Sequence, residues 1–172
     1  MKQPFFSLSY VVVIFLALVP VSRADTALMS ADWGKAACDA WNGDSVLTDG
    51  LATSGWVANN DGRGHKLLHV YRSDCADSPS VELRIADEGA KAHCVYGGAV
   101  QNALDLDVDY LMHAKTGHWI EMGNGDYGPM WAMMSFKLKF KGPKMEAMNN
   151  MEPFEAFLLL VGKVPSTAGA CP

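Results

Sequence analysis

The segment that decides the fold prediction is Met133-Met134-Ser135-Phe136-Lys137-Leu138-Lys139-Phe140-Lys141-Gly142, in which apolar and basic residues alternate. Phe136, Leu138 and Phe140 occupy every second position, and a lysine follows each of them. Successive side chains of a β-strand point to opposite faces of a sheet, so a strict period of two predicts a half-buried strand. One face of this strand is apolar and the other is basic.

Apolar segments flank this strand on both sides. Residues 129–134 before it are too apolar for a solvent-exposed loop, and residues 145–161 after it are apolar at close to helical spacing. Within the second segment, Pro153 and Gly162 would begin and end a helix, Glu152–Val161, which is predicted to move as a unit, like a lid. Methionine fills irregular space and repacks easily, so these methionine-rich segments suit the wall of a cavity with variable apolar contents. An ordinary core is the alternative.

The N-terminal half predicts a helix followed by a meander of strands. Ser30 is expected to cap a helix over residues 31–41, and the glycines between residues 43 and 64 predict turns or a mobile loop. Alternation of apolar and polar residues then predicts further elements. These are strands over residues 66–73, 81–85, 91–96 and 105–113, a hairpin turn at 87–89 and a short helix near 117–122.

The C-terminal arrangement resembles the sterol carrier protein 2 family, which ends with an apolar turn, a Gly-Lys-Leu-Lys-Ile type strand, a glycine and amphipathic helices. The resemblance extends over residues 30–163, but only its last third is specific. It implies an α+β domain in which helices cover a five-stranded, mostly antiparallel sheet and enclose an apolar tunnel for a lipid, without catalysis. Phe136 stands where the family usually has a glycine, so the local turn is expected to differ. The matching residues are Met133, Met134, Lys137, Leu138, Lys139, Phe140 and Gly142.

The resemblance places the expected lipid, a sterol, a fatty acyl chain or a phospholipid tail, between the sheet and the C-terminal helices. Apolar burial needs no specific hydrogen bond, so broad selectivity is expected. The apolar face of the lid helix is expected to touch a membrane transiently during lipid exchange. The predicted lipid-binding wall consists of Trp119, Met130, Trp131, Met133, Met134, Phe136, Leu138, Phe140, Met145, Met148, Phe154, Phe157 and Leu158.

Three aspartates, Asp105, Asp107 and Asp109, alternate along the predicted fourth strand. In the resembled fold the fourth and fifth strands are neighbours, so these aspartates are expected to face Lys137, Lys139 and Lys141 across a solvated face. Calcium binding is the alternative, but the glycine and terminal glutamate of an EF-hand are missing.

All four cysteines, Cys38, Cys75, Cys94 and Cys171, lie beyond the N-terminal apolar segment. An even number in an exported chain favours two disulfides, for which three connectivities are open. A three-stranded meander would bring Cys75 and Cys94 to one edge, so we predict Cys75–Cys94 and Cys38–Cys171.

Residues 1–24 are predicted to be a secretory signal peptide. Lys2 precedes an apolar run over residues 11–19, and Ser22-Arg23-Ala24 is a small-x-small cleavage site. An uncleaved membrane anchor is the alternative. The prediction leaves a lipid-binding domain over residues 25–165, a tail over residues 166–172, and an exported protein of the periplasm or extracellular space.

Composition excludes several classes of function. The net charge is −5 and the pI is near 5.4, which argues against a nucleic-acid partner. The sequence has no nucleophile elbow, phosphate loop or dinucleotide fingerprint, and its five histidines lack metal-ligand spacing. We therefore expect no enzyme activity, cofactor or metal. Two alternatives stay open: a periplasmic Cu(I)-binding protein that uses the methionine thioethers, and a ligand-free interaction module on the same fold. The oligomeric state is not predicted.

Overall fold

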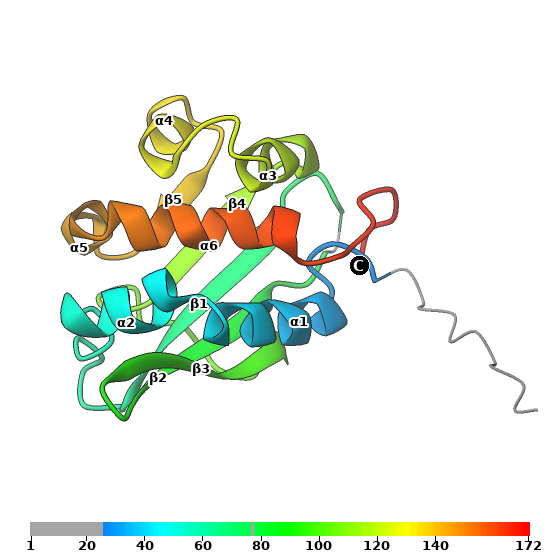
Figure 1. Ribbon diagram of the computed structural model, residues 1–172. Helices are drawn as coiled ribbons and strands as arrows, with labels where there is room; N and C mark the ends of the chain where they lie inside the picture. Colours follow the sequence, from blue (N-terminus) through cyan, green and yellow to red (C-terminus); the bar gives the residue numbers. More distant parts are fainter. Residues whose placement is uncertain (1–25, 77) are drawn as a thin grey trace, which may run out of the picture.

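Five strands form one sheet, and helices cover one of its faces (Figure 1). The computed structural model describes residues 26–76 and 78–172, so the predicted signal peptide lies outside the described residues. The strands are β1 (His65–Arg72), β2 (Val81–Glu88), β3 (Lys91–Ala99), β4 (Tyr110–Ala114) and β5 (Lys139–Lys141). Their order is β3-β2-β1-β4-β5, in which only the pair β1–β4 is parallel. The predicted α+β class and mostly antiparallel sheet are confirmed.

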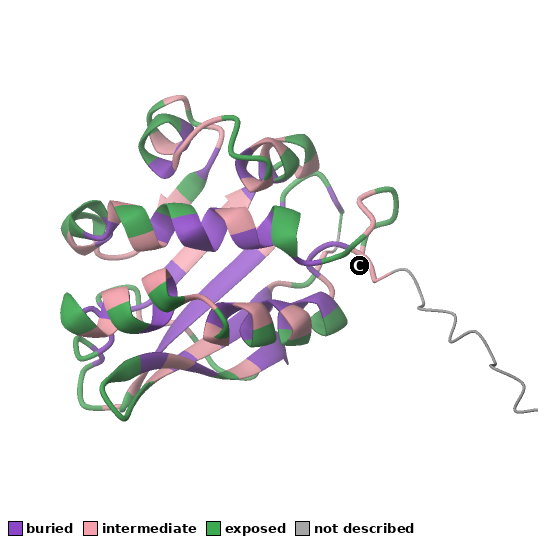
Figure 2. Ribbon diagram, in the orientation of Figure 1, coloured by how far each residue is buried: buried purple, intermediate pink, exposed green. Residues whose placement is uncertain are grey.

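The helices divide into a covering layer and a group near β5. In the covering layer, α1 (Ala31–Asn42), α2 (Ser45–Thr53) and α6 (Met151–Lys163) lie across one face of the sheet, with their buried sides towards it (Figures 1 and 2). Beyond this layer, α3 (Thr116–Gly123) packs on α6, while α4 (Pro129–Met134) and α5 (Lys144–Asn149) lie on either side of β5.

The first helix begins where the sequence predicts. The hydroxyl of Ser30 accepts a hydrogen bond from the Trp33 amide at 3.2 Å, which caps α1. The following segment was expected to be turns but contains α2, capped by the Asp44 carboxylate. Leu47 and Leu51, four residues apart, are both buried, because the residues on this side of α2 face the core.

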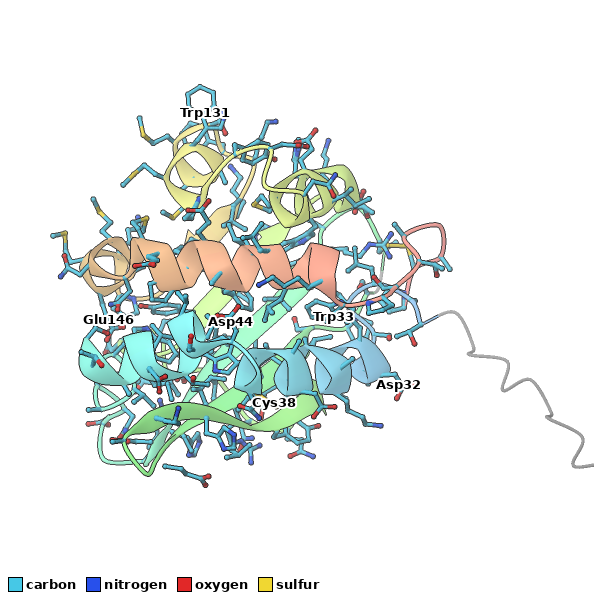
Figure 3. All side chains as sticks on the ribbon, in the orientation of Figure 1. Asp32, Trp33, Cys38, Asp44, Trp131 and Glu146 are labelled. Atoms are coloured by element: carbon cyan, nitrogen blue, oxygen red, sulfur yellow. A yellow bond between two sulfur atoms is a disulfide. The ribbon has the colours of Figure 1, made fainter. Side chains whose placement is uncertain are left out.

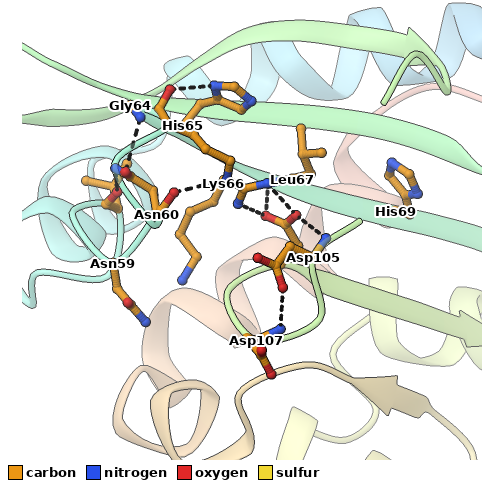
Figure 4. Close-up of polar contacts among 12 residues, drawn as sticks. Asn59, Asn60, Gly64, His65, Lys66, Leu67, His69, Asp105 and Asp107 are labelled. Atoms are coloured by element: carbon orange, nitrogen blue, oxygen red, sulfur yellow. Dashed lines mark hydrogen bonds and ion pairs between the residues drawn. The ribbon is translucent and has the colours of Figure 1, made fainter. Parts of the chain in front are cut away.

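The predicted strand over residues 105–113 is wrong in its first half. Asp109 is fully buried, and its carboxylate accepts hydrogen bonds from the Leu67 amide (2.8 Å) and the Asp105 amide (2.9 Å), as part of the network in Figure 4. Both terminal guanidinium nitrogens of Arg63 also donate to Asp109, at 2.9 and 2.7 Å. A buried carboxylate needs such partners, so residues 105–109 fold into a turn around it and β4 begins only at Tyr110.

The register of β4 and β5 rules out the predicted pairing of aspartates with lysines. Leu111 lies opposite Lys141, and His113 lies opposite Lys139.

Strand β5 is shorter than predicted, because Phe136 has a φ of 58° and breaks the extended conformation. This left-handed region favours glycine, the residue that the resembled family usually has here. As a result Phe136 is 72% exposed, although Leu138 is buried as predicted.

The two disulfides join Cys38 to Cys94 and Cys75 to Cys171, so the predicted connectivity is wrong. Helix α1 packs directly on β3, which brings Cys38 beside Cys94. The C-terminal segment returns past the end of β1 and reaches Cys75. It also pairs with the first described residues through a hydrogen bond from the Leu28 amide to the Thr167 carbonyl, so it is tied to the domain.

The apolar segment over residues 145–161 forms two helices, α5 and α6, that meet at Asn150, and the predicted helix Glu152–Val161 lies within α6. Helix α6 extends to Lys163, so Gly162 lies in its last turn and not just after its end. A Cβ on Gly162 would overlap the carbonyl oxygen of Gly123, and a Cβ on Gly123 would lie 2.7 Å from the Gly162 nitrogen. Helices α3 and α6 therefore touch backbone to backbone, which fixes α6 in place and leaves little freedom for a lid.

This close contact predicts a large effect of a single methyl group. We expect Gly162→Ala to lower the free energy of unfolding by about 1–3 kcal/mol, because the two helices must separate. Gly117→Ala, an exposed position of α3 with no atom near the added Cβ, should be neutral or stabilising by up to about 1 kcal/mol. Urea denaturation of both variants tests this. Equal stabilities would mean that α6 is free to shift.

Candidate functional site

A hollow of about 830 Å³ opens on the surface where α4, β5 and α5 meet. We call it the methionine groove. Its wall is mainly apolar, with lysines along one part. The lining residues are His113, Met130, Met133, Met134, Phe136, Leu138, Lys139, Phe140, Lys141, Lys144, Ala147 and Met148. This volume lies in the range of ordinary small-molecule sites, roughly 300–1,000 Å³.

Exposed apolar side chains concentrate around this groove. Six of the ten large hydrophobic residues that are exposed in the described part of the chain fall between residues 130 and 148. Trp131 points outward from α4 (Figure 3) and is 58% exposed, while Met134 on the same helix is 67% exposed. Exposed apolar patches are typical of protein, membrane and ligand interaction sites.

The structure brings seven of the thirteen predicted wall residues into the groove: Met130, Met133, Met134, Phe136, Leu138, Phe140 and Met148. Two more, Trp131 and Met145, lie outside its lining and are exposed on α4 and α5. The period-two pattern and the methionine spacing therefore indicated residues that gather around one hollow, although Phe136 reaches it through its turn conformation and not through the strand.

The other four predicted wall residues, Trp119, Phe154, Phe157 and Leu158, belong to the buried core. Trp119 donates its indole N–H to the Tyr71 carbonyl at 3.1 Å. Phe154 and Phe157 line a cavity of only about 30 Å³ between the sheet and α6, which has room for water but not for a lipid. A continuous tunnel through the core stays a prediction.

Helix α5 separates this small inner cavity from the methionine groove. Ala147 lines both, and its neighbour Glu146 holds the helix against the sheet. The Glu146 carboxylate lies 2.6 Å from the ammonium of Lys66, and it accepts a hydrogen bond from the Tyr110 hydroxyl at 2.8 Å. Lys66 also lies 4.4 Å from the centre of the Trp56 ring. These contacts fix one wall of the groove.

The Lys66 side chain is completely buried, which is unusual for lysine. Burial lowers the pKa of Lys66, and the hydrogen bond and charge of Glu146 oppose this shift. This cluster was not predicted from the sequence. A signal was present, because Lys66 occupies the same alternating positions as Leu68 and Val70, both of which are buried in the core.

The alternative of Cu(I) binding rests on methionine thioethers, and Met145, Met148 and Met151 recur at every third residue, but the structure does not place these three on one helix. Met145 and Met148 lie on α5, whereas Met151 begins α6 after the break. Among the described residues, no group of three or more His, Cys, Asp or Glu side chains is placed to hold a metal ion. Helices long and apolar enough to span a bilayer are likewise absent from this part of the chain.

Comparisons with known proteins agree with this architecture. The crystal structure of sterol carrier protein 2 matches with a TM-score of 0.53 and 18% identity, over 80% of this chain and 98% of that chain. A conserved hypothetical protein of Thermus thermophilus, described as a candidate sterol carrier protein, matches with a TM-score of 0.50 and 18% identity, over 87% of this chain and 99% of that chain. At such identities the similarity concerns the fold. A search of curated protein sequences gave no significant match.

The sequence model of the SCP-2 sterol transfer family matches residues 56–155. This range includes all five strands, and it contains every residue that lines the methionine groove. The match therefore covers more than half of the chain, including its candidate site. The chain belongs to the SCP-2 sterol transfer family.

Proposed function

We propose that this protein is an exported, non-catalytic carrier that binds an apolar lipid in the methionine groove. The observation that carries the proposal is the concentration of exposed methionine and aromatic side chains around a hollow of about 830 Å³. The family to which the chain belongs is named for sterol transfer, which supports lipid binding as its general function.

Apolar burial supplies the binding energy in this proposal. Transfer of apolar surface from water gains about 25 cal/mol per Å², before the entropic costs of association. Methionine side chains can repack around different ligands, so the wall accommodates apolar chains of different shapes. We expect a sterol, a fatty acyl chain or a phospholipid tail as the ligand.

Export is supported by the two disulfides. Such bonds persist in oxidising compartments and are rare in the cytosol. Together with the predicted signal peptide, they favour the periplasm or the extracellular space.

Transient membrane contact is proposed through α4 and the Phe136 turn rather than through α6. Trp131, Met134 and Phe136 are each more than half exposed, whereas Phe154 and Phe157 of α6 are buried. Aromatic and methionine side chains at the mouth of the groove can enter the membrane interface while a lipid is exchanged.

Phe136→Gly tests the groove without damage to the fold. The left-handed conformation of Phe136 costs about 1–3 kcal/mol, and glycine adopts it freely. Glycine also raises the conformational entropy of the unfolded chain, which lowers the stability by about 0.5–1 kcal/mol. This loss is no larger than the gain from the relieved strain, so the variant should be as stable as the wild type or slightly more so. The loss of an aromatic contact should weaken binding of a fluorescent long-chain fatty acid about tenfold.

The control is Leu106→Ser, which removes an exposed apolar side chain outside the groove lining and should leave the affinity unchanged. Native mass spectrometry of the oxidised protein should also detect a bound lipid at one per chain. A stable Phe136→Gly variant with wild-type affinity would place the binding site elsewhere.

A further inference from the structure

One part of the methionine groove is cationic, although the protein as a whole is acidic. Of the nine lysines in the described part of the chain, five form ion pairs with acidic side chains. Lys139, Lys141 and Lys144 line the groove and have no acidic partner among the described residues. The neighbouring Lys137, in contrast, is paired with Glu121 at 2.9 Å.

A histidine lies on the same face as two of these lysines. His113 is opposite Lys139 in the β4–β5 register, and Leu111 on the same face of β4 is opposite Lys141. The His113 ring stacks on Tyr71 with 4.6 Å between ring centres, and its buried Nδ1 has no hydrogen-bond partner within the described residues. The protein therefore does not fix the tautomer, so the neutral ring is free to carry its proton on Nε2, the nitrogen from which it would donate to a ligand in the groove that His113 lines.

The two charged groups that act on His113 within the described residues are both lysines. Burial lowers the pKa of His113, and the ammonium groups of Lys141 and Lys139 lower it further. An acidic ligand group would relieve this repulsion. The ammonium of Lys139 also lies 4.6 Å from the centre of the Phe136 ring, so the cationic part adjoins the apolar wall directly.

We propose that His113, Lys139, Lys141 and Lys144 bind the acidic head group, a carboxylate or a phosphate ester, of an amphiphile whose chain lies along the methionines of the groove. This inference rests on the proposed lipid-binding function. It narrows the ligand, because the groove then prefers an acidic amphiphile to a neutral lipid of similar apolar size. Charge-assisted hydrogen bonds in a partly apolar site supply the preference.

The affinities of the oxidised protein for oleate and for oleyl alcohol test the head-group inference separately from the proposed carrier function. We expect oleate to bind at least about tenfold more tightly than the alcohol, since hydrogen bonds between charged groups are stronger than those between neutral ones. Lys139→Met/Lys141→Met should remove most of this difference and leave the affinity for the alcohol nearly unchanged. Lys115→Met, which changes another unpaired lysine outside the groove among the described residues, is the matched control. The imidazole NMR signals of His113 should shift with oleate and much less with the alcohol.

Other results of these binding measurements would contradict either the head-group inference or the carrier function. Equal affinities of the wild type for acid and alcohol would overturn the head-group inference but leave the carrier function intact. Binding of neither would overturn the carrier function. Displacement of oleate by inorganic phosphate alone would indicate a site for free anions. A comparison of the affinities for oleate and oleyl phosphate shows whether the groove prefers a carboxylate or a phosphate head group. If the lysine variant kept its preference for oleate but no longer bound anionic vesicles, the lysines would serve membrane docking and the inference would be wrong.

Discussion

Replacement of Glu146 by alanine is expected to lower the free energy of unfolding by about 3–5 kcal/mol, because it leaves a buried charge without its partner. The side chain of Lys66 has no exposed surface, and its ammonium lies 2.6 Å from the Glu146 carboxylate. The same carboxylate accepts hydrogen bonds from Tyr110 (2.8 Å) and from the side-chain amide of Asn59 (2.8 Å). One substitution thus removes three interactions.

Urea denaturation measures this loss, with Glu152→Ala as the control at an exposed glutamate of the neighbouring helix. The double variant Lys66→Met/Glu146→Leu should recover most of the stability, since apolar side chains of similar volume often replace a buried ion pair without loss. A loss below about 1 kcal/mol for Glu146→Ala would mean that the pair behaves like an exposed one. Because α5 forms a wall of the methionine groove, Glu146→Ala should also weaken lipid binding.

Removal of the Cys75–Cys171 disulfide is expected to cost about 2–5 kcal/mol. The bond joins residues 96 positions apart and anchors the C-terminal segment. That segment supplies the carbonyls of Ala168 and Ala170 to the guanidinium of Arg72, each at 2.7 Å. Arg72 is only 3% exposed, so release of the segment would also leave a buried charge with fewer partners.

The variant for this test is Cys75→Ala/Cys171→Ala, and Ser73→Ala/Ser166→Ala changes exposed neighbours as a control. Equilibrium unfolding under oxidising conditions, which keep Cys38–Cys94 intact, gives the difference in stability. An unchanged free energy of unfolding would show that the hydrogen bonds to Arg72 hold the C-terminal segment without the disulfide.

The fold class could be predicted from the sequence because its signals are local. The alternation in β2, the cap at Ser30 and the methionine-rich segment each depend on neighbouring residues, and together with the family resemblance they indicated the sheet and its helices. The break between α5 and α6 gave a weaker signal, because the apolar spacing continues across Asn150.

Features that depend on long-range packing could not be predicted in this way. The spacing of Asp105, Asp107 and Asp109 fits a strand, but Asp109 is the buried partner of Arg63, and the residues before β4 form a turn instead. The disulfide partners depend on the packing of α1 against β3 rather than on the order of the strands. For the candidate site, composition indicated the segment, yet only the structure separates the groove residues from core residues such as Phe157 and Trp119.

The methionine methyl groups allow the most direct test of lipid binding in the methionine groove. Carbon-13 labelling of the methyl groups gives a separate NMR signal for each methionine, and oleate can be titrated into the oxidised protein. Met130, Met133, Met134 and Met148 line the groove, whereas Met112 lines the small inner cavity and Met29 is buried in the core. We predict that the four groove signals shift with a common affinity while those of Met112 and Met29 stay in place. A large shift of Met112 with unchanged groove signals would contradict this proposal and place the lipid between the sheet and α6.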